Sequence, residues 1–375
     1  MIVGVDATSL AGHMSGVGYY TARLIEGIGA GADRGIVGRL LLLSNRAIRA
    51  PSSPRIEVCR QGRFPVRAAW MQLVLPLLLR RIRPDLVHYT NYLAPVLGQT
   101  PYVVSIHDMS LALLPQLHTL RKRALMSTLV PYCARKAQIV LTPSEATRRD
   151  VERLLGIPGD RIKVIPYAAG PEFRPTPDRR PARAHVGDAP YLLHVGTIEP
   201  RKNLVRVLRA FARVVASLPD HRFLVVGQPG WLYEDVLREL ARPELQGRVV
   251  MAGYVQEAQL PALYSGADAF VYASLYEGFG LPVVEAMACG APVITSSTSS
   301  LAELAGDAAS LVDPEDEAML SEAMRRLCTD GTLRADLARR GRARAATFSW
   351  ERTAAATAEA YAQALDRTRR RASSR

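Results

Sequence analysis

The sequence has few cysteines, few aromatic residues and no long apolar run. Its four cysteines are scattered, with neither a CxxC pair nor a histidine at metal-ligand spacing. This argues against a disulfide framework or a zinc site, and it suits a reducing cytosol. No apolar stretch approaches the roughly 20 residues that span a bilayer. The chain also opens directly on an expected strand, without a signal peptide. We therefore expect a cytoplasmic globular protein.

The sequence also has fewer acidic than basic residues. The 375 residues include 48 basic and 35 acidic side chains, a net charge of +13. Such an excess leaves nucleic acid, anionic lipid and phosphorylated ligands open as partners. A sequence-tolerant nucleic-acid binder interleaves basic and aromatic residues on one face. Here aromatic residues are only 6% and the basic residues are scattered, so we expect no nucleic-acid partner.

Strand and helix patterns alternate along the chain, which predicts α/β architecture with parallel sheets. The length exceeds what one core usually covers and favours two domains. The stretch 170–188 is rich in Pro, Arg and Gly and is interpreted as the linker. An alanine-rich helix is expected from residue 353, followed by an arginine-rich tail that we expect to be disordered.

The most informative stretch, 277–285, reads Glu-Gly-Phe-Gly-Leu-Pro-Val-Val-Glu. An apolar strand precedes it. Pro282 suits the first turn of a helix that ends before Gly290. Such a helix start directs bare N–H groups at whatever lies above the loop. Glu277 and Glu285 would then hold hydroxyl groups of one ligand while the loop amides bind its phosphates. Alternatively, Glu285 complements the helix dipole and Glu277 is a loop charge.

Two cations follow the strand that starts at Tyr191. Arg201 and Lys202 come just before a helix whose apolar residues repeat every 3.6 positions. We expect both cations at the helix N-terminus, where they would hold a diphosphate. The alternative is a solvated basic turn.

In the first half, two weaker signals follow predicted strands. Gly16 and Gly18 lie in a glycine-rich loop after the first strand, but the third glycine of a dinucleotide fingerprint is absent. This argues against a Rossmann oxidoreductase. His107 follows the strand 103–106, and ligands of open α/β sheets bind at the carboxyl ends of strands. A lone histidine is otherwise more often structural.

The apolar segment 68–79 is flanked by arginines, which allows a helix lying on an anionic membrane surface. A strand follows at once, so an ordinary helix packed on the sheet is favoured. The arginine-rich tail, with Arg367, Arg369, Arg370, Arg371 and Arg375, offers a second contact to such a surface.

The stretch 277–293 resembles the signature of retaining glycosyltransferases of the GT-B fold, family 4. The variant Gly-Thr-Ile-Glu-Pro-Arg-Lys-Asn at 196–203 resembles that of the mannosyltransferase-like branch. The resemblance implies two Rossmann-like domains facing a central cleft. The acceptor domain would be 1–172, joined by a C-terminal helix at 353–375 that crosses back to it. The donor domain would be 188–352.

The resemblance also implies roles for single residues. Lys202 falls where the family binds phosphate. Thr197 stands where the family often has an arginine, so Arg201 is expected to supply that charge. Glu277 would bind hydroxyls of the donor sugar, Glu285 the ribose, and His107 the transferred sugar. Backbone groups near Val255 would meet the base. The remaining expected donor contacts are Gly16, Gly18, Gly278, Phe279, Gly280 and Leu281.

The implied reaction moves a sugar from a nucleotide diphosphate sugar to a hydroxyl, with retention at the anomeric carbon. No Asp-x-Asp occurs in the chain, so we expect neither a metal nor another cofactor, and we assign no general base. The 196–203 variant suggests GDP-mannose or GDP-D-rhamnose, with UDP- and ADP-sugars as alternatives. We expect a glycan or polyprenyl-diphosphate-linked acceptor of bacterial polysaccharide or lipopolysaccharide synthesis, at the inner face of the cytoplasmic membrane. A non-catalytic nucleotide-binding or nucleic-acid-binding protein is the competing class.

Overall fold

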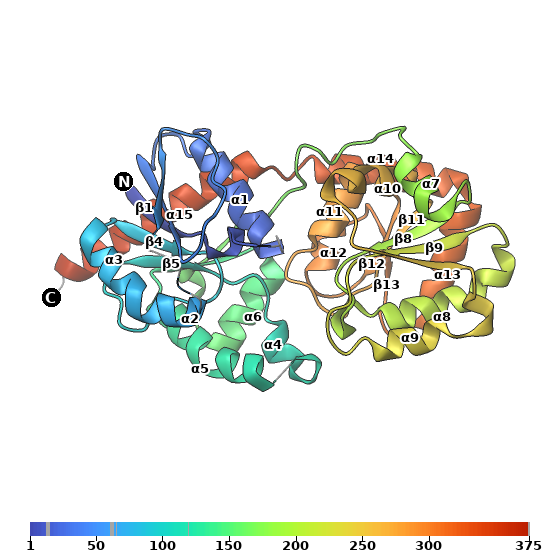
Figure 1. Cartoon of the computed structure of the whole chain (residues 1–375), viewed down its shortest axis with the longest axis horizontal. Helices are drawn as coiled ribbons and strands as arrows, with labels where there is room; N and C mark the ends of the chain where they lie inside the picture. Colours follow the sequence, from blue (N-terminus) through green and yellow to red (C-terminus); the bar gives the residue numbers. More distant parts are fainter. Residues whose placement is uncertain (13–15, 61–63, 65, 119, 374–375) are drawn as a thin grey trace. The chain divides into compact units, whose positions relative to one another are not determined.

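The computed structural model describes residues 1–12, 16–60, 64, 66–118 and 120–373. The chain divides into two compact units (Figure 1). Unit 1 comprises Met1–Tyr167 and Ser349–Arg375, and unit 2 comprises Ala168–Phe348. The segment 170–188 falls in unit 2, where it carries a short helix.

Unit 1 is built on a parallel sheet of seven strands in the order β3-β2-β1-β4-β5-β6-β7. Its strands are β1 (Ile2–Asp6), β2 (Arg39–Ser44), β3 (Ile56–Arg60), β4 (Leu86–Tyr89), β5 (Tyr102–Ser105), β6 (Ile139–Thr142) and β7 (Ile162–Val164). The order reverses between β1 and β4, as in doubly wound nucleotide-binding folds.

Unit 2 repeats this plan with six parallel strands in the order β10-β9-β8-β11-β12-β13. Its strands are β8 (Tyr191–Val195), β9 (Arg222–Val226), β10 (Val249–Gly253), β11 (Ala269–Tyr272), β12 (Val293–Ser296) and β13 (Ser310–Val312). Here the order reverses between β8 and β11. Ligands of such sheets bind outside the carboxyl ends of the strands at the reversal.

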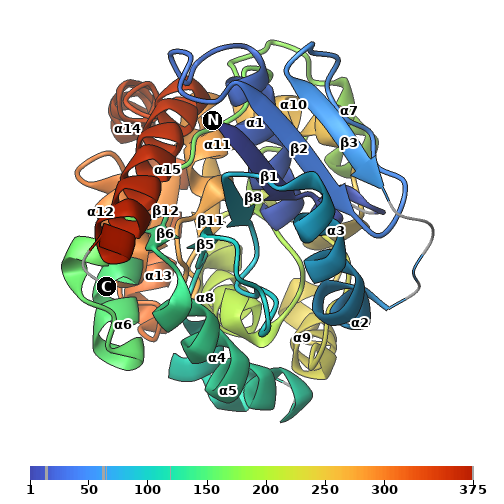
Figure 2. The ribbon, with the colours of Figure 1, turned by 90° about the vertical axis from the view of Figure 1, so that its left-hand side faces the viewer.

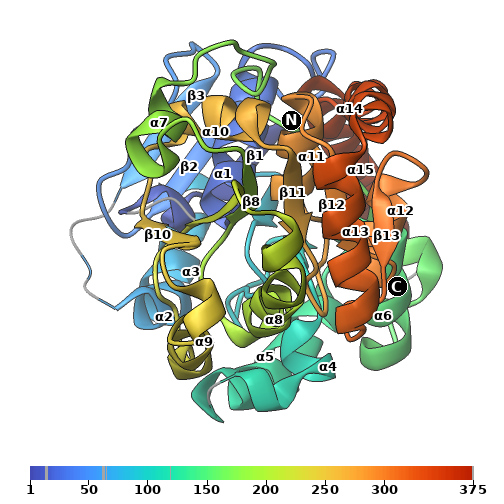
Figure 3. The same cartoon turned by 90° about the vertical axis from the view of Figure 1, so that its right-hand side faces the viewer.

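Helices cover both faces of the two sheets. Those of unit 1 are α1 (Gly16–Gly29), α2 (Arg67–Ala69), α3 (Leu75–Ile82), α4 (Ser110–Leu113), α5 (Leu120–Lys136), α6 (Glu145–Leu155) and α15 (Trp350–Ser373). Those of unit 2 are α7 (Arg180–Val186), α8 (Leu204–Val214), α9 (Glu234–Leu240), α10 (Leu260–Gly266), α11 (Leu281–Ala288), α12 (Ser299–Ala305), α13 (Glu317–Thr329) and α14 (Gly331–Ala345). In unit 1, α15 packs beside α1 (Figure 2). In unit 2, α8 packs against α9 and α13, and α11 packs against α10 and α14 (Figure 3).

The apolar periodicity of α8 explains the packing of unit 2. Val207, Leu208 and Phe211 are fully buried, and the Phe211 ring lies 5.3 Å from that of Phe223 on β9. Burying such a side chain contributes about 1.5–3 kcal/mol. The predicted helix and strand patterns in this half are therefore confirmed.

Local sequence signals also set several helix ends correctly. Ser144 caps α6, since its side chain accepts a hydrogen bond from the Thr147 amide. Pro282 lies in the first turn of α11. Gly290, with φ of +80°, lies two residues past the last residue of that helix.

Other expectations need correction. Gly16 and Gly18 lie in the first turns of α1, not in a loop, because the apolar face that includes Tyr20 and Leu24 packs as a helix from the start. Residues 13–15 of the expected loop lie outside the described residues. The prediction of a disordered tail is wrong as far as Ser373. Helix α15 continues to that residue, and Arg367 forms an ion pair with Asp160. Ala and Arg are both strong helix formers.

The segment 68–79 is helical but irregular. It runs from α2 through a π-helical stretch, Trp70–Val74, into α3. Trp70 is fully buried, whereas Leu73 and Leu77 are 66% and 63% exposed. Among the helices of the described residues, none has the length and apolarity that a bilayer crossing requires.

Candidate functional site

The candidate donor site lies in unit 2, at the reversal of its strand order. The loop after β8 carries Arg201 and Lys202, and the loop after β11 carries Glu277. Since β8 and β11 are parallel neighbours, their carboxyl ends bring these loops together. Lys202 and Glu277, 75 residues apart in sequence, thus meet in one cluster.

Glu277 binds both cations. One carboxylate oxygen lies 2.7 Å from Arg201 Nη1, and the other lies 2.7 Å from Lys202 Nζ. All three side chains are largely buried, Glu277 being 7% exposed as a residue. Glu199 completes the cluster with a 2.7 Å contact to Arg201 Nη2. Neither cation therefore extends alone into solvent.

The charge state of Glu277 follows from these contacts. Burial alone would raise its pKa, but the positive charges of Arg201 and Lys202 outweigh burial and lower that pKa to about 2. Tyr272, at the end of β11, joins the group: its hydroxyl accepts from Lys202 Nζ and donates to Glu277 Oε1 at 3.1 Å. Glu277 is thus an anion throughout the physiological range.

The four charged groups of the cluster, two carboxylates and two cations, sum to zero. A diphosphate arriving here would compete with Glu277 for Lys202 and Arg201. Cations that keep buried partners are held in place before a ligand binds, which favours electrostatic stabilisation of a leaving group. The cluster can thus bind an anion and at the same time present a carboxylate to hydroxyl groups.

The turn that carries the cations differs from the expectation. Arg201 and Lys202 lie in a 3-10 turn, Pro200–Lys202, that precedes α8 rather than in the α-helix itself. Asn203 ends the turn in a left-handed conformation, φ +59°. Its side-chain nitrogen, Nδ2, donates to the carbonyl oxygens of Ala273 and Pro314, at 3.0 and 2.6 Å. These bonds fix the turn against the segments that follow β11 and β13.

Three residues after Glu277, the chain enters α11 through Gly280. Its φ of +110° disfavours other residues, and a Cβ here would lie 2.6 Å from Leu301 Cδ2. Within the described residues, the amides of Gly280 and Leu281 have no hydrogen-bond partner. The loop therefore keeps two N–H groups at a helix N-terminus, which is an arrangement suited to phosphate.

Glu285, one turn into α11, is buried and 8% exposed. Burial raises its pKa to about 8, the neighbouring carboxylates Glu257 and Glu172 add to that rise, and a 3.1 Å hydrogen bond from the Tyr264 hydroxyl opposes it. In contrast to Glu277, this carboxyl is largely protonated at neutral pH. The two glutamates of the signature therefore have opposite electrostatic environments.

The other expected donor contacts of unit 2 are spread around this cluster. Thr197 is exposed in the loop after β8, and Val255 is buried just after β10. Gly278 is buried beside Glu277. Phe279 packs edge-on against Phe348, with ring centroids 5.8 Å apart, so its ring supports the loop.

In unit 1, His107 follows β5, as expected from the sequence. Its Nε2 lies 2.6 Å from the Thr90 carbonyl and its Nδ1 lies 2.7 Å from the Tyr167 hydroxyl. Burial lowers the pKa of this histidine. Both ring nitrogens are thus occupied, which argues against His107 as a general base. Gly16 and Gly18 belong to the same unit, at the start of α1.

Sequence reasoning missed the partners of the site residues. Tyr272, Tyr264 and Tyr167 each donate to a predicted site residue. Tyr272 ends a predicted buried strand, a position that could have drawn attention to it. Glu199 lies inside the quoted motif but was not assigned a role. Among the described residues, no group of three or more His, Cys, Asp or Glu could hold a metal ion.

Comparison with known proteins assigns the fold and the family. Residues 15–172 match the family model described as Glycosyltransferase Family 4, and residues 176–344 match that described as Glycosyl transferases group 1. Sucrose-phosphate synthase from Thermosynechococcus elongatus superposes with a TM-score of 0.80 at 22% identity, covering 96% of this chain and 98% of that one. This similarity confirms the expected GT-B fold.

Several curated relatives are named as mannosyltransferases. O-antigen chain mannosyltransferase B of Escherichia coli is 33% identical over 306 residues, which is 79% of this chain and 77% of that protein. Serotype-specific mannosyltransferase WbdA of Escherichia coli is 30% identical over 239 residues, but this region spans only 29% of its length. The chain belongs to family 4 of the GT-B-fold glycosyltransferases and is itself a glycosyltransferase.

Proposed function

We propose that this enzyme transfers mannose, or the related D-rhamnose, from a GDP-sugar to a hydroxyl of a glycan or lipid-linked acceptor, with retention and without a metal. The relatives named as an O-antigen chain mannosyltransferase and a serotype-specific mannosyltransferase support a mannosyl donor and a role in bacterial surface polysaccharide or lipopolysaccharide synthesis. A UDP- or ADP-sugar is the alternative donor.

The observation that carries this proposal is the cluster of Arg201, Lys202 and Glu277 below the start of α11. As the donor bond breaks, negative charge grows on the leaving diphosphate. Lys202, Arg201 and the amides of Gly280 and Leu281 would stabilise that charge, in place of a metal ion. Glu277 would hold hydroxyls of the transferred sugar.

Glu285 would accept hydrogen bonds from the ribose of the donor. No side chain is assigned as the base, and a diphosphate oxygen would take the acceptor proton on the same face. The direct test of the donor is whether the protein binds GDP in preference to UDP and ADP while EDTA is present.

We further propose that unit 1 contacts an anionic membrane surface. Leu73 and Leu77 are exposed on one face of the α2–α3 segment, and Leu97 is 80% exposed. The Gln72 side chain hydrogen-bonds Ala94 and Val96, so the loop that carries Leu97 lies beside this helix. Exposed leucines beside basic residues suit the interface of a membrane.

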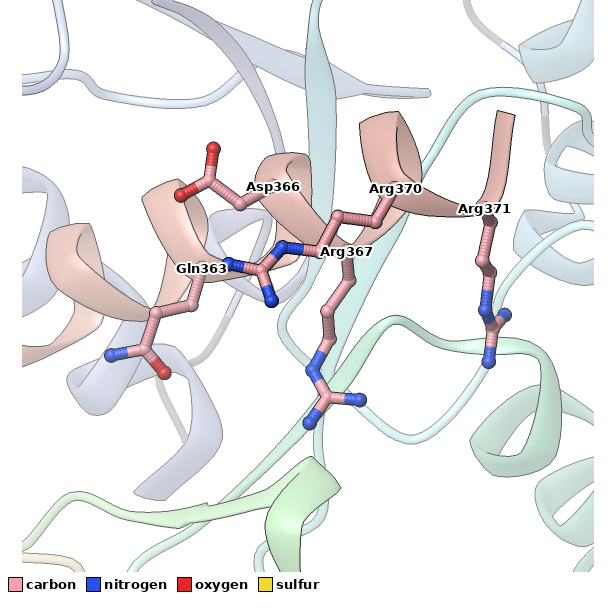
Figure 4. Close-up of a pocket in the computed structure, with 5 residues that line it drawn as sticks. All are labelled: Gln363, Asp366, Arg367, Arg370 and Arg371. Atoms are coloured by element: carbon pink, nitrogen blue, oxygen red, sulfur yellow. The ribbon is translucent and has the colours of Figure 1, made fainter. Parts of the chain in front are cut away.

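The basic residues of this proposed surface are arginines at the ends of α3 and α15, near the amino-terminal ends of the strands of the unit 1 sheet. Within the described part of the chain, Arg80, Arg81 and Arg83 at the end of α3 have no ion-pair partner. At the end of α15, Arg367 contacts Asp160 just before β7. Figure 4 shows Arg367 and Arg371 pointing in the same direction from this helix, while Arg370 turns back along it.

Co-sedimentation with phosphatidylglycerol vesicles at low salt tests the membrane proposal. We expect wild-type protein to pellet and the double variant Leu73→Gln/Leu77→Gln to bind about 10²-fold or more weakly, since each inserted leucine contributes about 1.5–3 kcal/mol. The matched control, Leu232→Gln/Leu237→Gln, removes two exposed leucines of unit 2 and should pellet like wild type. Wild-type protein that stays in the supernatant would refute the proposal.

A further inference from the structure

The chain passes between the units twice, and both passages begin beside one aromatic pair of unit 1. Unit 1 ends at Tyr167 and resumes at Ser349. The rings of Tyr167 and Trp350 stack, with centroids 6.0 Å apart and an interplanar angle of 12°. The Thr353 hydroxyl donates to the Pro166 carbonyl at 2.6 Å. The two passages are therefore anchored to each other within unit 1.

Tyr167 connects this anchor to His107. Because the Thr90 carbonyl can only accept, the Nε2 of His107, 2.6 Å away, carries a proton. In the neutral ring Nδ1 is then an acceptor, and the Tyr167 hydroxyl at 2.7 Å is its donor. One carbonyl and one hydroxyl thus fix both the tautomer and the orientation of the imidazole.

In the part of the chain that the structure describes, tyrosine rings pack around this histidine. The rings of Tyr20, Tyr92 and Tyr167 lie 5.1, 5.7 and 6.0 Å from it. Asp108 is the neighbouring carboxylate, and it raises the pKa of His107 only against the larger, opposite effect of burial. The nearby His88 is itself buried, with a pKa lowered to about 3, and carries no charge. The Tyr167 hydroxyl is therefore the polar side-chain partner of the Nδ1 atom.

The same core contains a second tyrosine–histidine pair, whose hydrogen bonds go to partners other than His107. His88 contacts the Tyr361 hydroxyl through Nδ1 at 2.7 Å and the Ser105 hydroxyl through Nε2 at 2.8 Å. Tyr361, on α15, is fully buried. This pair has the same chemistry and comparable burial, so it supplies a matched control.

We propose that Tyr167 is a positioning residue for sugar transfer: its hydroxyl donates to Nδ1 of His107 and, together with the Thr90 carbonyl, holds the ring in the Nε2–H tautomer, and its ring ties that histidine to the two passages between the units. The inference rests on the proposed function, in which His107 contacts the transferred sugar. A shift of the main chain at either passage would move Tyr167, and the hydrogen bond from its hydroxyl would then move the His107 ring.

The test compares Tyr167→Phe with Tyr361→Phe. Each variant keeps the ring and removes one buried hydroxyl. Nitrogen NMR of the imidazoles, with His107 assigned from a His107→Gln spectrum, reports tautomer and titration directly. We expect Tyr167→Phe to shift the His107 nitrogens and to raise its titration midpoint, because Nδ1 becomes free to bind a proton. Turnover of GDP-mannose should fall about tenfold in kcat with KM little changed.

Tyr361→Phe should leave the His107 resonances and kcat at wild-type values. His107 resonances unchanged in Tyr167→Phe would overturn the proposal, and so would equal effects of the two variants on His107. Resonances that shift while kcat stays constant would support the positioning contact and refute the role of His107 in transfer. If Tyr167→Phe does not fold, Thr353→Val tests the anchor, and unchanged His107 resonances there would also count against the proposal.

Discussion

Replacing Lys202 by Met should lower donor turnover by about 10²–10³-fold. A buried donor aimed at charge that develops in the transition state has this effect in other enzymes. Lys202 lies 2.7 Å from Glu277 and is 9% exposed as a residue. Methionine keeps most of the volume of the side chain. The affinity for GDP should fall by about 10-fold or more, since a charge-assisted hydrogen bond contributes about 1.5–3 kcal/mol.

The matched control is Arg213→Met, which removes one positive charge from α8 at an exposed position beside Glu317. It should leave turnover unchanged. Because Glu277 keeps Arg201 as a partner in the Lys202→Met variant, the variant should remain folded, which a thermal melt can verify. Wild-type turnover in a folded Lys202→Met protein would remove the cluster from the mechanism.

The second large effect is expected at Glu285. Replacing it with Gln should weaken GDP binding by about 10-fold, since the amide keeps only one of the two carboxyl oxygens and the ribose hydroxyls would lose an acceptor. The same change should stabilise the free protein at alkaline pH. The folded-state pKa of Glu285 is about 8, against an ordinary value near 4.5. The folded state therefore favours the protonated carboxyl. The contribution of Glu285 to the free energy of unfolding falls as pH rises from about 4.5 to 8.

Above pH 8 the buried carboxylate costs the wild-type protein on the order of a few kcal/mol, and glutamine removes this cost. Thermal melts should thus show Glu285→Gln more stable than wild type at pH 9 and similar to it at pH 5. Glu239 provides the opposite case. It is also buried in unit 2, but Arg209 and Arg242 outweigh burial and lower its pKa. Glu239→Gln should be destabilising at pH 9, and a destabilised Glu285→Gln at that pH would contradict the assigned environment.

Much of the fold followed from local patterns. The 3.6-residue period of 204–218 and the apolar strands predicted at 191–196 and 269–273 appear as α8, β8 and β11. These patterns are visible because each buries a continuous face. The first turn of α1 and the helical tail after residue 365 were mispredicted, because glycine and arginine there gave no apolar signal and the helices are set by neighbouring turns.

The site was predictable as a set of residues but not as an arrangement. Motif resemblance named Lys202, Glu277 and Glu285, yet the ion pairs that join Glu277 to two cations depend on the β8–β11 pairing. The amino-acid sequence alone also does not predict that the pKa values of Glu277 and Glu285 shift in opposite directions. Burial raises the pKa of both carboxyls. At Glu277 the charges of Arg201 and Lys202 outweigh burial, whereas at Glu285 burial dominates and the carboxylates Glu257 and Glu172 add to it.

The most direct test of the account is calorimetric titration of the wild-type protein with GDP, UDP and ADP, each in the presence of EDTA. We predict one binding site, a clear preference for GDP and no change in affinity when EDTA is replaced by Mg²⁺. Binding that requires the added metal, or no binding by any of the three nucleotides, would contradict the proposal that Arg201, Lys202 and the start of α11 hold the donor diphosphate.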